Sequence, residues 1–187
     1  YGPRFDRALA VSAAGRQLRA LGLGEDIAHA ATLNRHPVLP VMRDRRIVDA
    51  AESILGPDLM IWGVEYFIKE PGAGKIVSWH QDLTYWGMDG TDHEATAWVA
   101  LSPATEASGC MKFVPGSHRQ AIVPHVDTFA ADNLLSRGQE IAVEVDEAQA
   151  VAVALQPGQM SLHHGRLFHA SGPNVTGDRR IGFVVRF

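Results

Sequence analysis

The pattern of hydrophobic and polar positions changes its period once along the chain. Residues 6–21 predict an amphipathic helix of moderate quality, and residues 45–55 predict a better one. Asp44 can cap the second helix, and the Gly-Pro pair at 56–57 ends it. From about residue 61 onward the hydrophobic residues alternate with a period of two, which is typical of strands.

Several segments of the second part are predicted strands, and Gly/Pro turn signals such as "PGAG" and "QPGQ" separate them. The predicted strands are 61–69, 95–102, 140–146, 150–155, 160–164 and 180–187. Many short strands with this punctuation indicate a sandwich or barrel, so we expect a mainly β fold with N-terminal helices. The segment 115–139 is too long for a hairpin turn, and we expect it to cover one mouth of the sheet structure.

Chain length indicates a single domain. With 187 residues the chain is long enough to bury a sizeable core. We expect one domain over 1–187, with a helical part over about 1–56 and the β core over about 57–187. Because the chain starts at Tyr1 without methionine and stops at Phe187 inside a strand-like segment, we expect a portion of a longer protein.

Charge and cysteine content narrow the partners and the compartment. The formal net charge is -4, with 17 basic and 21 acidic residues and no basic run of the kind that binds nucleic acid or anionic membranes. Cys110 is the only cysteine, which suits a reducing compartment. No apolar segment approaches the roughly 20 residues that a membrane span needs. We expect a cytoplasmic protein that acts on a small molecule, with no nucleic-acid or membrane partner and an open oligomeric state.

The segment "WHQD" (79–82) carries the first candidate chemistry. If it continues or ends a strand, the period of two turns His80 and Asp82 to the same side and Gln81 to the other. Two ligands of one metal ion need that arrangement. A lone His-x-Asp pattern is weak, and a histidine in a surface turn is the alternative interpretation.

A second segment, "SLHHGRLFHASGPNVTGDRR" (161–180), strengthens the metal hypothesis. It offers three histidines, a turn of small residues and two arginines before the last strand. Two imidazoles and one carboxylate on one face of a metal leave coordination positions open, which is the arrangement of non-haem Fe(II) oxygenases. Such an enzyme also needs a cation for the distal carboxylate of 2-oxoglutarate, and an arginine meets a carboxylate with two parallel hydrogen bonds. Arg180 stands 11 residues after His169 and is the candidate.

At this point a family resemblance becomes specific. The motifs "FIKEPGAGK", "WHQDLTYW", "TAWVALSPATEASGCMKFVPGSH" and "HASGPNVTGDRR", in this order, resemble the phytanoyl-CoA dioxygenase family of Fe(II)- and 2-oxoglutarate-dependent oxygenases. The similarity runs from about residue 53 to 187, whereas residues 1–52 carry little of the pattern. It implies a double-stranded β-helix, a jelly roll of the cupin type. It also implies Fe(II), 2-oxoglutarate and O2 as cofactors, with ascorbate as an aid in vitro.

The same resemblance assigns roles to individual residues. The implied iron ligands are His80, Asp82 and His169. Arg180 is expected to hold the C5 carboxylate of 2-oxoglutarate with help from the Ser171 hydroxyl, and Trp98 is expected to line the cosubstrate pocket. The chain departs from the family at Gln159, where an acidic residue often follows the "PG" of the turn.

Other histidines compete for the distal ligand position. His163 and His164 lie in the preceding strand, and one of them must face the interior. We favour His169 because the "H-x-S-G-x-N" turn begins at this residue and the spacing to Arg180 is counted from it. We expect the other two histidines to pack or to hydrogen-bond within the sheet. His93 and the aspartates at 89 and 92 lie in the turn "GMDGTDHE", which backbone requirements explain.

Residues that contact the substrate are harder to identify from the sequence than the metal ligands. Trp86, six positions after His80, either walls the substrate pocket or belongs to the core, and both interpretations stay open. His118 in "PGSH" is expected to brace a loop, with substrate contact as the alternative. If Glu65 and Lys69 face inward on one strand, each is the expected partner of the other.

The predicted reaction is hydroxylation of an unactivated C–H bond of a small molecule, with succinate and CO2 as co-products. A halogenase of the same family is one alternative, which Asp82 disfavours because halogenases carry a small residue at that ligand position. A jelly roll that binds metal without turnover is the other, which the intact triad and Arg180 disfavour. A CoA ester substrate is not predicted, since the basic residues available near the mouth are only Lys112, Arg119 and Arg137.

Overall fold

The computed structural model describes residues 45–86 and 93–187, all of which belong to one unit that spans 44–187. The predicted helix 6–21, the capping Asp44 and the two turn aspartates at 89 and 92 lie outside the described residues. The predicted helix 45–55 is confirmed as α4 (Arg45–Leu55), which buries Ala51. Among the described residues, no helix combines the length and the apolar character that crossing a membrane requires.

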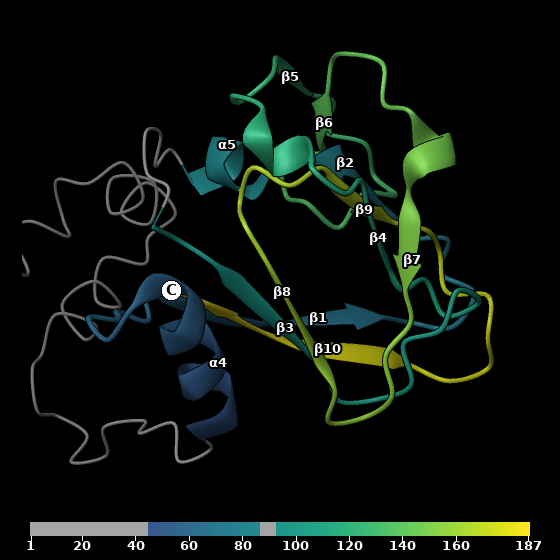
Figure 1. Cartoon of the computed structure of the whole chain (residues 1–187). Helices are drawn as coiled ribbons and strands as arrows, with labels where there is room; N and C mark the ends of the chain where they lie inside the picture. The colour runs from purple at the N-terminus through teal and green to yellow at the C-terminus, as the bar shows by residue number, and fades with distance from the viewer. Residues whose placement is uncertain (1–44, 87–92) are drawn as a thin grey trace, which may run out of the picture. The chain divides into compact units, whose positions relative to one another are not determined.

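Two four-stranded antiparallel sheets form the body of the fold (Figure 1). In spatial order, the first sheet consists of β1 (Gly63–Lys69), β10 (Arg180–Arg186), β3 (Thr96–Ala100) and β8 (Met160–His163). The second consists of β2 (Val77–His80), β9 (His169–Ser171), β4 (Met111–Phe113) and β7 (Val151–Val153). A third, two-stranded sheet consists of β5 (His125–Asp127) and β6 (Gln139–Ile141), and β6 packs against β2. Two sheets of four antiparallel strands with this crossed order are the predicted jelly roll, which is therefore confirmed.

The hydrophobic core lies between the two sheets. Trp98 on β3 and Val184 on β10 pack in one cluster with Met111 on β4. Strand β3 is buried along its whole length because it lies between β10 and β8 and under the second sheet. The two sheets therefore pack against each other through the paired strands β3 and β10 of the first sheet and β4 of the second.

Strand β1 turns its polar residues toward the interior. Glu65 and Lys69 alternate with Val64, Tyr66 and Ile68, and these three hydrophobic side chains are exposed. The sequence pattern alone does not say which face of this strand is buried. The observed orientation brings two charged residues into the space between the sheets, where they contribute to the site described below.

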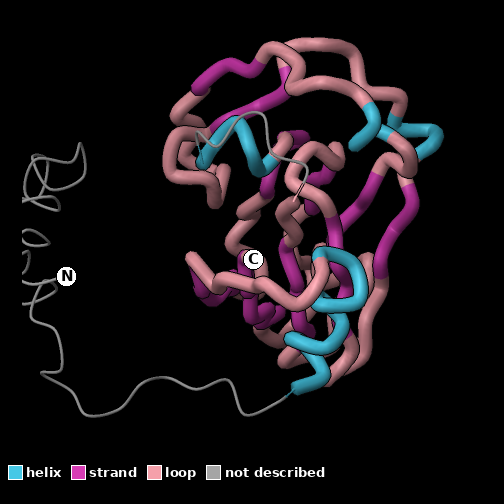
Figure 2. Tube along the Cα trace, turned by 60° about the vertical axis from the view of Figure 1, so that its left-hand side comes forward, coloured by secondary structure: helices cyan, strands magenta, loops and turns pink. Residues whose placement is uncertain are grey.

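Several element boundaries differ from the sequence prediction, and the predicted strands 95–102, 150–155 and 160–164 are shorter in the structure, as β3, β7 and β8. The predicted strand 140–146 pairs only over β6, and a 3-10 helix, η2 (Glu147–Gln149), follows it. The segment 115–139 is not a bare loop, since it contains η1 (Ser117–Arg119) and β5. Strand β2 ends at His80, and the short helix α5 (Asp82–Trp86) begins two residues later. In Figures 1 and 2, α5 and the β5–β6 pair lie at the same end of the fold.

Candidate metal centre

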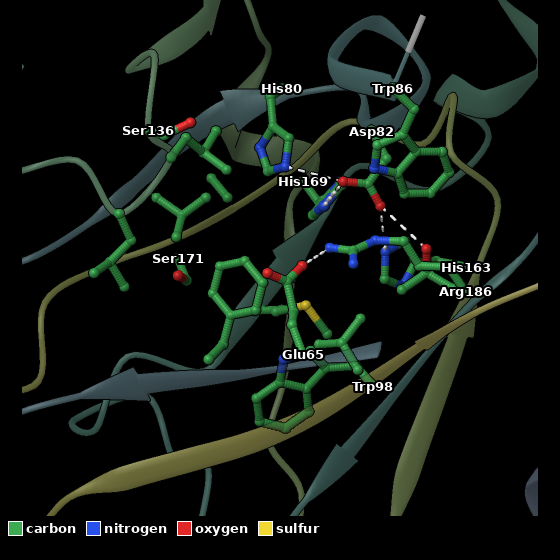
Figure 3. A pocket seen from close by; sticks show the side chains of 18 of the residues that line it. Glu65, His80, Asp82, Trp86, Trp98, Ser136, His163, His169, Ser171 and Arg186 are labelled. Atoms are coloured by element: carbon green, nitrogen blue, oxygen red, sulfur yellow. Dashed lines mark hydrogen bonds and ion pairs between the residues drawn. The ribbon is translucent and has the colours of Figure 1, made fainter. Parts of the chain in front are cut away.

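Three residues expected to bind iron come together at one point between the sheets. His80, Asp82 and His169 each offer one ligand atom, and these atoms lie within 4.8 Å of one another. The two imidazole Nε2 atoms are 3.4 Å (His80) and 3.7 Å (His169) from Oδ1 of Asp82 (Figure 3). His80 and His169 are direct register partners in the β2–β9 pair, so the sheet itself places the two rings side by side. All three side chains are buried.

Asp82 reaches this point from the first residue of α5 rather than by strand alternation. A short acidic side chain is favoured at a helix N-terminus, which explains the change of structure after His80. Gln81 between them points elsewhere, as predicted: its amide donates to the carbonyl of Arg166 (2.9 Å) and accepts from the backbone N–H of Val123 (2.8 Å). The buried amide thus anchors two loops and fixes the chain between the two candidate ligands.

Backbone carbonyl groups orient both imidazoles. Nδ1 of His80 lies 2.8 Å from the carbonyl of Ser78, and Nδ1 of His169 lies 2.8 Å from the carbonyl of Leu167. A carbonyl only accepts, so each Nδ1 must carry the proton and donate it. Each Nε2 then presents its lone pair toward Asp82, which is the orientation that a metal ligand requires.

The local electrostatics keep these groups in their ligand forms. Burial, followed by the neighbouring His80, lowers the pKa of His169 well below its ordinary value. Burial alone would raise the pKa of Asp82, but the neighbouring histidines, His169 first and then His163 and His80, hold it well below the usual range. An ionised Asp82 beside a neutral His169 is the protonation state that a divalent cation binds.

The second oxygen of Asp82 has its own partners. Thr96 Oγ1 donates to Oδ2 (3.2 Å), and Nε2 of His163 lies 3.4 Å from the same atom. His163 is buried, with its ring 4.7 Å from that of His169. His164 points elsewhere, and its Nδ1 lies 2.9 Å from Oε1 of Glu94. As expected, one of the adjacent histidines faces the interior, and it contacts the carboxylate rather than joining the three clustered ligand atoms.

A cavity of about 200 Å³ opens beside this cluster. Trp98, Ser171 and Arg180 line it together with the three candidate ligands. The guanidinium carbon of Arg180 lies 5.1 Å from the centre of the Trp98 ring, a cation–π contact. Gly182 makes this arrangement possible, because any Cβ at that position would meet the Trp98 ring at 2.0 Å. The structure therefore brings all three predicted cosubstrate residues to the cavity that holds the candidate metal ligands.

Lys69 does not line the cavity but contacts Ser171, which does, and the sequence analysis did not recognise this role. Its ammonium group donates to Oγ (2.6 Å) and to the carbonyl of Ser171 (3.0 Å), and also to the carbonyl of Gly172. Burial, and secondly the charge of Arg180, lower the pKa of Lys69 to about 7. The expected pairing of Lys69 with Glu65 is wrong, because Glu65 pairs with Arg186 from the neighbouring strand. The sequence signal that could have identified Lys69 was the alternation of residues along β1, which turns this lysine toward the interior.

The charges around Arg180 suit an anionic ligand. Arg180 and Lys69 are each 1% exposed, and no acidic side chain of the described residues forms an ion pair with either. Within that part of the chain, Nε of Arg180 is buried without a hydrogen-bond partner. Burial lowers the pKa of Arg180 to about 10, so the guanidinium stays charged near neutral pH. Buried cations are destabilising unless an anion pairs with them, and a dicarboxylate bound from the cavity would supply one.

Of the two candidate substrate residues, Trp86 lines the cavity and His118 does not. Trp86 lines the cavity beside Asp82 (Figure 3). His118 does not reach it, because η1 places this histidine on a separate hollow that it shares with His164. His163 borders both hollows. His93 is exposed and lies outside the cluster of ligand atoms.

Two turn residues support the site without lining it. Gln159 replaces the acidic residue frequent in the family, and its side-chain oxygen accepts from the backbone N–H of Gln156 (2.7 Å), so it closes the turn itself. Asn174 is buried after β9, where its amide donates to the carbonyls of Lys69 (3.0 Å) and Asp178 (2.7 Å). This asparagine therefore anchors the loop that follows His169.

Comparisons with known proteins agree with this geometry. The sequence profile of the phytanoyl-CoA dioxygenase (PhyH) family matches residues 7–182. A probable alpha-ketoglutarate-dependent hypophosphite dioxygenase of Stutzerimonas stutzeri is 30% identical over 150 residues, which cover 79% of this chain and 51% of the relative. Human peroxisomal phytanoyl-CoA dioxygenase is 28% identical over 167 residues, which cover 87% of this chain and 48% of that protein. The chain thus spans about half the length of these curated relatives.

Solved structures show the same fold. The apo form of ThoJ, a non-heme monooxygenase, superposes with a TM-score of 0.66 at 37% identity, covering 98% of this chain and 64% of that one. EvdO2 of Micromonospora carbonacea var. aurantiaca, complexed with 2-oxoglutarate, gives a TM-score of 0.64 at 32% identity, covering 80% of this chain and 60% of that one. With the family profile matched over most of the sequence, the chain belongs to the phytanoyl-CoA dioxygenase family.

Proposed function

We propose that this chain is an Fe(II)- and 2-oxoglutarate-dependent oxygenase that hydroxylates an unactivated C–H bond of a small molecule. One observation carries the proposal: the three clustered ligand atoms and the unpaired, buried Arg180 share a single cavity. A metal site alone would fit many functions. Its combination with a buried cation for a distal carboxylate is what this class of oxygenase requires.

The donor set fits Fe(II). Two neutral imidazoles and one carboxylate, supplied by His80, His169 and Asp82, leave open positions for a chelating cosubstrate and for O2. Iron with 2-oxoglutarate and O2 supplies the oxidising chemistry when bound, with succinate and CO2 as co-products. Asp82 neutralises part of the metal charge and occupies the position that a halogenase leaves to a halide. The carboxylate therefore favours hydroxylation over halogenation.

The cosubstrate would bind along the cavity. Arg180 is suited to receive the C5 carboxylate through two parallel hydrogen bonds, and the Ser171 hydroxyl can donate a third. Lys69 adds a second positive charge and positions Ser171 through the hydrogen bond to Oγ. Trp98 holds Arg180 from one side and keeps water away from the carboxylate. The names of two relatives, the alpha-ketoglutarate-dependent dioxygenase and the 2-oxoglutarate complex of EvdO2, support this assignment.

The test begins with succinate production. The protein, reconstituted with Fe(II) and ascorbate under air, should slowly convert 2-oxoglutarate to succinate without any added substrate, and a metabolite mixture should accelerate this turnover. Products are then sought by mass spectrometry as a gain of one oxygen atom. His169→Ala should abolish succinate formation, whereas the matched variant His118→Ala, on a hollow outside the cavity, should retain it. Absence of succinate from the iron-loaded parent protein would refute the proposal.

A further inference from the structure

A second arginine, Arg186, is largely buried and faces the same cavity at the other end of β10. The inward face of this strand carries Arg180, Gly182, Val184 and Arg186 in alternation. Six residues of strand separate the two arginine Cα atoms by roughly 20 Å. A five-carbon dicarboxylate held at Arg180 is much shorter than this separation. Arg186 therefore remains available for a different ligand of the cavity.

Two tryptophans fix the position of Arg186. Its guanidinium carbon lies 5.4 Å from the centre of the Trp86 ring and 5.8 Å from that of Trp62. The two indoles meet edge to face at 4.7 Å. Cation–π contacts of this kind hold the guanidinium without using its N–H groups. The two indole rings thus fix the orientation of the guanidinium, and its N–H groups stay free to donate hydrogen bonds into the cavity.

The acidic partner of Arg186 among the described residues is the more exposed member of the pair. Arg186 forms an ion pair with Glu65, and the two side chains point toward one another across the cavity, below Asp82 and above Trp98 in Figure 3. The side chain of Arg186 is 14% exposed, whereas that of Glu65 is 41% exposed. If another anion took the place of Glu65, the released Glu65 carboxylate would stay hydrated. Arg186 would still have the negative partner that a largely buried cation needs.

The guanidinium also has donor capacity to spare. A guanidinium carries five N–H donors. Nε of Arg186 is buried and lacks a hydrogen-bond partner among the described residues. An orphaned buried donor is unfavourable, and an incoming acceptor would satisfy it. The ion pair with Glu65 therefore leaves part of the recognition surface of Arg186 unused.

Much of the remaining cavity wall is apolar. Val77, Leu134, Leu135 and Met111 line it together with Trp86, and Thr96 and Ser136 add two hydroxyl groups. The apolar side chains suit a hydrocarbon portion of a ligand. With Arg180 assigned to the cosubstrate, the combination of Arg186 with these apolar side chains favours molecules that carry one anionic group on an apolar body.

We propose that the substrate is a small organic acid whose carboxylate binds Arg186 between Trp62 and Trp86 in exchange for Glu65. This inference rests on the proposed oxygenase function, because it assigns the substrate of that same cavity. The guanidinium of Arg186 packs on Trp86, which belongs to the same short helix as Asp82, so the carboxylate binds on the metal side of the cavity. The oxidised carbon is therefore one near the carboxylate, not one at the far end of the apolar body.

Matched neutral compounds test the charge requirement. The protein is loaded with Ni(II) and 2-oxoglutarate, which keeps it from turning over, and ligand-observed NMR measures the binding of hexanoate and 3-phenylpropanoate and of their primary amides. Because a charge-assisted hydrogen bond is lost in the amide, each acid should bind roughly 10- to 100-fold more tightly than its amide. Equal binding of acid and amide, or no binding of either acid, would overturn the inference.

Two substitutions with opposite expected effects separate recognition from structure. Arg186→Gln should remove the preference for the acid, whereas Glu65→Gln should strengthen acid binding several-fold by releasing Arg186 from its competitor. A purely structural ion pair would give losses of the same sign in both variants. Arg179→Gln is the matched control, because it breaks an Arg–Glu pair, with Glu70, that lies on the surface away from the cavity.

Succinate assays on the same proteins tell this inference apart from the proposed function. If the parent protein forms succinate but shows no preference for acids, only the substrate assignment fails. If it forms none, the oxygenase proposal fails. Arg186→Gln should leave the half-saturating concentration of 2-oxoglutarate in substrate-free turnover within about twofold of the parent value. An increase comparable with that of Arg180→Gln would mean that Arg186 binds the cosubstrate, and would overturn the inference.

Discussion

Nε2 of His163 lies 3.4 Å from Oδ2 of Asp82, while Oδ1 of the same carboxylate faces the two candidate iron-binding imidazoles. The two oxygens of one carboxylate thus have separate partners. A carboxylate held in this way can offer a single oxygen to the metal, because the other is occupied by His163 and Thr96. His163 is in this respect a positioning residue for Asp82.

His163→Phe should weaken iron binding without unfolding the protein. The phenyl ring fills the buried space next to Phe113 and removes only the contact with the carboxylate. Loss of such an outer contact typically lowers metal affinity about 10- to 100-fold. Competition of Fe(II) with a chelator measures the change, and His118→Phe, outside the cavity, is the control. An unchanged iron affinity in His163→Phe would show that Thr96 alone is sufficient to hold Asp82.

Arg180→Gln should impair the use of 2-oxoglutarate. Removal of a charge-assisted contact of ~1.5 to 3 kcal/mol corresponds to roughly 10- to 150-fold weaker binding. Arg179→Gln should have little effect, because Arg179 pairs with Glu70 on the surface. The half-saturating concentration of 2-oxoglutarate in the succinate assay distinguishes the two variants, and equal losses would contradict the assignment of Arg180.

Lys69 should make cosubstrate binding depend on pH. Its pKa of about 7 means that the ammonium form is present below this pH and is lost above it. The positive charge attracts the dianionic cosubstrate, so binding takes up a proton and the dissociation constant of 2-oxoglutarate should rise as the pH increases through 7. Lys69→Met should bind more weakly at low pH and lose most of this dependence. Identical pH profiles for the two proteins would exclude a role for the charge.

The sequence was sufficient for features that local periodicity determines. The predicted helix 45–55 agrees with α4 at both ends, and the predicted strands at 61–69 and 180–187 are β1 and β10 with small changes of length. Family motifs also indicated which residues gather at the cavity. The helix and the two strands depend on residues close together in the chain, where spacing is visible, whereas the cavity residues were indicated by the order of the motifs.

Long-range pairing was not visible in the same way. Alternation on β1 placed Glu65 and Lys69 on one face, but their partners, Arg186 and Ser171, come from strands more than 100 residues away. Local spacing therefore suggested the wrong pair. The helix that begins at Asp82 was not predicted, because a strand that continued and a helix that began at this aspartate both turn it toward His80.

Asp82 offers the most direct test of the central claim, that these three residues hold iron for 2-oxoglutarate turnover. The measurement is iron content together with succinate production for the parent protein, Asp82→Ala and Asp82→Glu under identical Fe(II) loading. The account predicts that the parent retains iron and forms succinate. Asp82→Ala should lose most of the iron and form none, and Asp82→Glu should perform poorly because one extra methylene shifts the oxygen by more than the ~0.5 Å tolerance of a working site. Retention of iron and parent-like succinate production by Asp82→Ala would contradict the account.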